Sequence, residues 1–305
     1  MTDFTPAKED SSSLQALLQS EIETKKKRRR RIWTAVFVIA LIVLVASLAA
    51  LGVIAYSYFQ GQQKYGEIAA KADFKPSDVQ EDGKLDAVTV DWDALKAANP
   101  DTVAWVYIPG TGINYPVVQG EDNEHYLYYD FDNDAGWLAE YGSIFLDYQN
   151  DPKFTDPVEF IYGHHMNDGS MFAPIASLED QAAFDEHRIA YVLTPNGNYR
   201  LRSFAVVHCP SDEAIVQVKF NSKKELSAYI QDKLDRSLVD PGKIPAVKDM
   251  GHVFAFATCD AASAGRDILF TYVLDTSAKG LEGEVGLDSN KNSTWFVDDL
   301  SETKK

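Results

Sequence analysis

The sequence predicts a mainly β domain, an antiparallel barrel or sandwich of about eight strands with added helices, preceded by one transmembrane helix. Two observations lead to this fold class. Apolar, β-branched and aromatic residues form strand-like runs throughout residues 86–278, without the strand–helix alternation of a parallel sheet. Near the N-terminus, residues 32–59 contain no charged side chain, and a helix of that length can cross a bilayer.

The basic run before the apolar segment predicts how the chain is oriented in the membrane. Seven consecutive Lys and Arg residues occupy positions 25–31. By the positive-inside rule, we expect residues 1–31 to be a cytoplasmic tail and residues 32–59 a transmembrane helix. A cleaved signal peptide is the rival interpretation, but its apolar region is usually only about 7–15 residues long. The prediction is a single-pass protein of the cell membrane, with its folded domain outside the cell.

The remaining segments are assigned from composition. We expect residues 60–85, which are mostly polar, to form an extracellular spacer, residues 86–278 to form the domain, and residues 279–305 to form a C-terminal tail. The formal net charge of the whole chain is −17, whereas the segment 1–31 by itself carries a net positive charge. The domain is therefore acidic, which argues against nucleic acid as a partner because phosphate binding needs Lys and Arg.

Eight runs in the domain have strand composition. They are VAWVYI (103–108), INYPVV (113–118), GSIFLDY (142–148), VEFIYG (158–163), RIAYVL (188–193), YRLRSFAVVH (199–208), HVFAFATC (252–259) and DILFTYVL (267–274). The intervening TPNGN segment is typical of a hairpin turn. Helices are predicted at 91–100 and 222–238; the second has a capping box and an apolar stripe that serves packing.

Cys259, at the end of the strand-like run 252–259, is the first candidate for chemistry. In an extracellular domain it could form a disulfide with Cys209, the other cysteine in the chain. A metal site is less favoured, because no Cys-x-x-Cys spacing exists and the adjacent side chains of His164 and His165 diverge on a strand. As a nucleophile, Cys259 would need a base or an imidazolium nearby to favour the thiolate.

Residues for such a reaction are present. The GHH motif that contains His164 closes an apolar strand and opens into a polar loop, and Arg266 follows Cys259 by seven positions. A histidine could favour the thiolate and protonate a leaving amine, and an arginine could stabilise the oxyanion formed at a carbonyl. These three residue types are sufficient for acyl transfer.

Four stretches of the sequence carry a resemblance to a known family. They are NPDTVAWVYIPGTGINYPVVQGEDNEHYLYYDF (99–131), YGSIFLDYQN (141–150), YGHHMNDGSMF (162–172) and ATCD…GR (257–266). In order and spacing they resemble the sortases, membrane-anchored cysteine transpeptidases of Gram-positive bacteria, and class B in particular. The helix predicted at 222–238 resembles the class B insertion. The resemblance covers residues 86–275 and implies a distorted antiparallel β-barrel.

The resemblance also implies the roles of particular residues. Cys259 would be the nucleophile, His164, directly after the glycine, the catalytic histidine, and Arg266 the residue that stabilises the transition state. Four further residues match positions beside the cysteine or along the peptide groove: Asn123, Leu127, Tyr162 and Thr258. The implied reaction needs no metal or organic cofactor.

The implied substrates are exported proteins with a C-terminal sorting signal, cleaved at threonine through a thioester on Cys259. The implied acceptor is an amine of a cell-wall precursor, or a pilin lysine if the enzyme polymerises pili. Two alternatives stay open: a different wall-active cysteine enzyme, and a non-catalytic anchored surface module held by a 209–259 disulfide.

Overall fold

The computed structural model of the chain describes residues 11–79, 83–134, 141–259 and 265–278. It divides into two units, Met1–Phe59 and Gln60–Lys305. Helix α1 (Ser11–Lys71) begins in the first unit and ends in the second.

In the first unit, residues 32–59 of α1 are apolar and most of their side chains are exposed. Trp33 and Ile42, for example, are each 62% exposed. An 18-residue window of this helix has a mean hydropathy of 3.0, so the helix is long and apolar enough to cross a membrane. Such a helix near the N-terminus could be a membrane anchor or a signal sequence.

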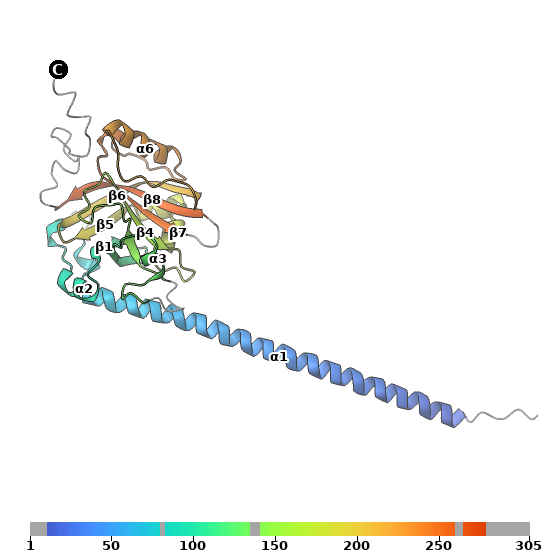
Figure 1. Cartoon of the computed structure of the whole chain (residues 1–305). Helices are drawn as coiled ribbons and strands as arrows, with labels where there is room; N and C mark the ends of the chain where they lie inside the picture. The colour runs from blue at the N-terminus through green and yellow to red at the C-terminus, as the bar shows by residue number, and fades with distance from the viewer. Residues whose placement is uncertain (1–10, 80–82, 135–140, 260–264, 279–305) are drawn as a thin grey trace, which may run out of the picture. The chain divides into compact units, whose positions relative to one another are not determined.

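The second unit is built on a closed barrel of eight strands. Figure 1 labels β1, β4, β5, β6, β7 and β8 of this barrel. The strands are β1 (Thr102–Ile108), β2 (Ile113–Val118), β3 (Ile144–Leu146), β4 (Val158–His164), β5 (Ile189–Thr194), β6 (Gly197–Pro210), β7 (Val253–Cys259) and β8 (Gly265–Thr276). Around the barrel their order is β1-β2-β3-β4-β7-β8-β6-β5. Most neighbours pair antiparallel, but β2 with β3 and β4 with β7 pair parallel. The predicted distorted antiparallel barrel is therefore confirmed.

Short helices connect and cover the strands. They are η1 (Pro76–Asp78), η2 (Leu85–Ala87), α2 (Trp92–Ala98), α3 (His125–Tyr128), α4 (Ala173–Ser177), α5 (Gln181–Glu186), α6 (Lys223–Asp235) and η3 (Val247–Asp249). The two helices predicted from sequence correspond to α2 and α6. Ser222 caps α6 by accepting a hydrogen bond from the Glu225 amide, as the capping box requires. The predicted stripe of α6 is buried at Leu226, Tyr229 and Ile230.

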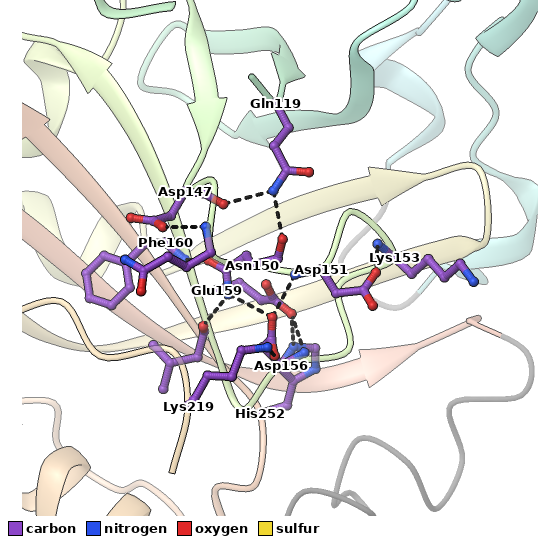
Figure 2. A network of polar contacts seen from close by, with 12 residues as sticks. Gln119, Asp147, Asn150, Asp151, Lys153, Asp156, Glu159, Phe160, Lys219 and His252 are labelled. Atoms are coloured by element: carbon purple, nitrogen blue, oxygen red, sulfur yellow. Dashed lines mark hydrogen bonds and ion pairs between the residues drawn. The ribbon is translucent and has the colours of Figure 1, made fainter. Parts of the chain in front are cut away.

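The parallel pairing of β4 with β7 is the feature that matters most for the site. Seven consecutive residue pairs are in register, from Val158 opposite Val253 to His164 opposite Cys259. Since parallel strands run in the same direction, the carboxyl ends of both strands meet at one end of the barrel. At the other end, Glu159 and His252 belong to a buried polar network with residues of the β3–β4 loop (Figure 2).

Candidate active site

His164 and Cys259 end neighbouring strands and face each other in the β4–β7 register. The backbones of paired strands lie about 4.8 Å apart, so the two residues are as close as the sheet allows. The residues that follow Cys259, 260–264, and the Cys259 side chain lie outside the described part of the chain. Because the strands are far apart in sequence, only the barrel topology brings the predicted histidine beside the predicted cysteine.

The His164 ring is half-buried and held by backbone groups. Its Nε2 lies 2.6 Å from the carbonyl oxygen of Leu127. A carbonyl can only accept a hydrogen bond, so Nε2 carries a proton and donates it. Nδ1 is then the ring nitrogen that is left for contact with a substrate. The neighbouring His165 instead forms an isolated bridge with Met171 in the loop after β4.

Arg266 lies on β8, the next strand in the barrel. The β7–β8 pairing ends with Ala257 opposite Ile268, and continuing that register by two residues along each strand would place Cys259 opposite Arg266. The guanidinium donates a hydrogen bond to the carbonyl of Ser211 in the loop after β6. Its Nε is buried and has no hydrogen-bond partner among the described residues. Three adjacent strands thus bring His164, Cys259 and Arg266 to one region of the barrel.

An ion pair with α6 fixes the loop that holds Arg266. The Arg236 guanidinium on this helix's C-terminal side binds both carboxylate oxygens of Glu213, at 2.6 and 3.0 Å. Glu213 and Ser211 belong to the same short loop, so this pair restrains the carbonyl that Arg266 contacts. The same interaction holds the pKa of the Glu213 carboxyl below its usual value.

Two of the predicted substrate-binding residues meet on a carboxylate that the sequence did not single out. Asp147, 1% exposed, accepts hydrogen bonds from Asn123 Nδ2 at 2.9 Å and from the Tyr162 hydroxyl at 2.8 Å. Asn123 Oδ1 also accepts a bond from the Tyr148 amide. Asp147 directly follows the apolar strand β3, and an acid in that position is the signal that could have identified it.

The other two predicted residues lie beside the catalytic candidates. Leu127 contributes its backbone carbonyl to His164. Thr258 precedes Cys259 and is fully buried, and its hydroxyl has no hydrogen-bond partner among the described residues. The structure therefore brings Leu127 and Thr258 next to the strand ends, and joins Asn123 to Tyr162 through Asp147.

Cys209 is a free, buried thiol. It lies on β6 opposite Arg266, so β8 separates it from β7 and Cys259. Two strand spacings amount to about 9.6 Å, well beyond the 4.4–6.8 Å between Cα atoms that a disulfide spans. Burial and the nearby Glu213 carboxylate raise the pKa of the Cys209 thiol, which makes it a poor nucleophile. This geometry argues against the surface module held by a 209–259 disulfide.

Among the described residues, one group has the composition of a metal site. Glu179, His208 and Asp267 place their ligand atoms within 4.8 Å of one another. His208 Nδ1 lies 2.6 Å from an Asp267 oxygen and 3.6 Å from a Glu179 oxygen. A hydrogen-bonded His–Asp pair accounts for this arrangement without an ion. We still predict, from the family resemblance, that catalysis uses no metal or cofactor.

Comparisons with known proteins show which family the chain resembles. No family model matches the chain. Sortase B of Staphylococcus aureus is 28% identical over 171 residues, covering 56% of this chain and 68% of that protein. Sortase B of Listeria monocytogenes is 32% identical over 166 residues, covering 54% of this chain and 65% of that protein. The alignments therefore span about two thirds of each relative's length.

Solved structures extend the likeness to the fold. The structure of sortase B from Bacillus anthracis in complex with AAEK1 matches with a TM-score of 0.61 and 27% identity, over 72% of this chain and 98% of that one. Clostridium perfringens sortase B matches with a TM-score of 0.56 and 26% identity, over 60% of this chain and 99% of that one. The Staphylococcus aureus sortase B–substrate complex has a TM-score of 0.62 at 24% identity, which shows the fold alone.

A closed eight-stranded barrel with these strand ends defines a sortase-type protein. Within that type, the sequence and structural relatives agree on one class. The relatives in sequence and in structure support a class B sortase.

Proposed function

We propose that this chain is a cysteine transpeptidase that uses His164, Cys259 and Arg266 to transfer the acyl part of a sorting-signal peptide to an amine. The observation that carries the proposal is the β4–β7 register, which ends with His164 opposite Cys259. The likeness to sortase B proteins supports a sortase-type enzyme in general.

The first half of the reaction forms a thioester. The Cys259 thiolate attacks the backbone carbonyl of threonine in the sorting signal, and the negative charge moves to the carbonyl oxygen. Arg266 stabilises this oxyanion as a fixed cation. When the C–N bond breaks, His164 as imidazolium gives the departing amine a proton, through Nδ1 because Nε2 donates to Leu127. The leaving peptide departs and the acyl group stays on sulfur.

The second half returns the enzyme to its starting state. An incoming amine, from a cell-wall precursor, gives a proton to His164 and attacks the thioester carbonyl. Arg266 again stabilises the oxyanion, and collapse expels the Cys259 thiolate beside the imidazolium. One peptide bond has been broken and one amide bond formed. Between the two steps the thioester keeps the acyl group activated for transfer.

The remaining predicted residues are proposed to recognise the peptide. Asn123 and Tyr162 form one hydrogen-bonded unit with Asp147, which gives that side of the groove a fixed shape. Thr258 offers a buried hydroxyl directly before the nucleophile. We also propose that residues 32–59 anchor the enzyme with its N-terminus in the cytoplasm, which keeps the domain near membrane-bound substrates.

The proposal is tested with the Gln60–Lys305 unit, peptides carrying different sorting signals and a wall-type peptide amine. We expect cleavage and amide transfer by the unaltered unit and by Cys209→Ala, and loss of both with Cys259→Ala, His164→Ala and Arg266→Ala. Normal turnover by Cys259→Ala would contradict the proposal. Transfer to a pilin lysine in preference to the wall peptide would favour pilus polymerisation.

A further inference from the structure

The last part of α1 packs against the barrel within the second unit. After Gln60, the helix buries Tyr65 (7% exposed) and Ile68 (1% exposed), and Ala72 and Phe74 directly after it are also buried. This burial makes residues 60–74 part of the folded domain's surface layer. The hydrogen bonds of this segment lead toward the candidate histidine.

The Tyr65 hydroxyl donates a buried 2.6 Å hydrogen bond to the carbonyl of Gly142. Its ring is held edge-on against Tyr115, with centroids 5.4 Å apart and an angle of 90° between the planes. Burial raises the pKa of Tyr65, so the hydroxyl stays protonated and remains a donor. A buried carbonyl that lost this donor would be left unsatisfied, at a real cost in free energy.

Gly142 lies beside the His164 ring, with no room for a side chain between them. It has a φ of +51°, and a Cβ atom there would lie 2.9 Å from His164 Cδ2 and 2.6 Å from the Leu127 carbonyl oxygen. The same Leu127 oxygen binds His164 Nε2. The backbone of Gly142 and the carbonyl of Leu127 together form a cradle for the imidazole, and a side chain at position 142 would not fit beside the ring.

Neighbours of Tyr65 on the helix hold both flanks of this cradle. Lys64 pairs with Asp130 at 2.5 Å and with Asp132 at 3.2 Å, in the segment that follows Leu127. Gln62 donates to Asp168 at 3.2 Å in the loop after His164. Each of these acids lies close in sequence to a residue that touches the imidazole or carries it.

The loop after His164 is also tied to residue 141. Asp168 accepts a 2.7 Å bond from Tyr141, directly before Gly142. Burial acts to raise the Asp168 pKa, but the bonds from Ser170, Tyr141 and Gln62 outweigh it and keep this carboxyl ionised. An ionised acceptor makes these contacts charge-assisted and therefore stronger.

We propose that Tyr65 is a positioning residue for His164, acting through the Gly142 carbonyl, so that the end of α1 is part of the catalytic apparatus. This rests on the proposed function, in which His164 protonates the leaving amine. The hydroxyl of Tyr65 fixes Gly142, Gly142 limits the tilt of the imidazole, and the Leu127 carbonyl then fixes which nitrogen faces the substrate. Tyr65 touches neither the peptide nor the sulfur, so it affects turnover more than binding.

The test is Tyr65→Phe in the full chain in detergent micelles, which keeps the ring packing and removes only the hydroxyl. We expect a roughly five-fold or larger fall in kcat with little change in KM, the size of one lost buried hydrogen bond. Because Tyr65 touches neither the peptide nor the sulfur, the loss should appear in kcat while KM stays close to that of the unaltered chain. Tyr199→Phe is the matched control, since that buried hydroxyl also donates to a backbone carbonyl, of Phe154, 3.4 Å away.

A second readout separates this inference from the proposed function. The Cε1–H NMR signal of His164 should shift in Tyr65→Phe and stay in place in Tyr199→Phe. Unchanged kcat and an unchanged NMR signal would overturn the positioning role, even if His164→Ala is inactive. If His164→Ala keeps normal turnover, the proposed function fails, and the NMR signal still decides whether Tyr65 holds the ring. Should Tyr65→Phe not fold, Lys64→Met gives the same comparison: lower kcat supports the role and unchanged kcat rejects it.

Discussion

Acid sensitivity of the fold should depend on His252, at the end of the barrel opposite the candidate active site. Its ring is fully buried, and Nε2 lies 3.4 Å from an oxygen of Glu159, which is also fully buried (Figure 2). Burial lowers the pKa of His252 to about 3 and raises that of Glu159 well above its usual value. We conclude that both groups are neutral in the folded protein, because burying two charges costs more than their attraction returns.

The size of the effect follows from proton linkage. Below pH 6.5 the unfolded chain protonates His252, whereas the folded protein resists until about pH 3. The contribution of His252 to the free energy of unfolding is therefore fully present above pH 6.5 and is lost as the pH falls. Between pH 7.5 and pH 5 the loss is about 2 kcal/mol. Glu159 has the opposite sign: its contribution is present below the unfolded pKa of 4.5 and is lost as the pH rises.

Because the two residues oppose each other between pH 4.5 and 6.5, only a comparison with a variant isolates His252. The change is His252→Gln, and the assay is urea unfolding of the Gln60–Lys305 unit at pH 7.5 and pH 5. The stability advantage of the unaltered unit should be about 2 kcal/mol smaller at pH 5. Glu159→Gln is the control of opposite sign and should gain relative stability as the pH rises. If the unaltered unit exceeds His252→Gln in stability by as much or more at pH 5 than at pH 7.5, the neutral pair is refuted and an ion pair is indicated.

Three further changes test the site. Asp147→Ala removes a buried carboxylate that accepts three hydrogen bonds, from Asn123, Tyr162 and the Gln149 amide, so we expect about 2–4 kcal/mol less stability in urea unfolding and a raised KM for the peptide. Gly142→Ala forces a methyl group against His164 at a positive φ, and kcat should fall by about ten-fold or more in the transfer assay. Arg236→Met breaks a pair that is one-third exposed, so stability should fall by at most about 1 kcal/mol, while kcat falls several-fold because the loop that holds Arg266 loosens.

Much of the barrel could be predicted because its strands are buried and long. All eight apolar runs correspond to strands of the barrel. The short helices α3, α4 and α5 were not predicted, since a helix of four to six residues shows no period in its apolar positions. That β4 pairs in parallel with β7 also cannot be derived from composition, and the sequence predicted only a mostly antiparallel barrel.

The site shows the same division between local and long-range information. Cys259, Arg266 and the histidine pair could be selected because their residue types match one reaction, but the choice of His164 over His165 came from the family resemblance. Asp147 acts through partners far from it in sequence, and no local pattern shows them. Tyr65 lies in a segment whose polar composition predicted a spacer. Tyr65, Ile68 and Ala72 are spaced as on one face of a helix, and this pattern could have predicted that the face is buried.

The measurement that tests the central claim most directly is mass spectrometry of the unit quenched in acid during turnover of a sorting-signal peptide. We expect a mass increase equal to the acyl part of the peptide, located by fragment mapping on Cys259 and removed by hydroxylamine. Cys209 should stay unmodified. An acyl group on Cys209, or continued transfer without any acylated cysteine, would contradict the mechanism.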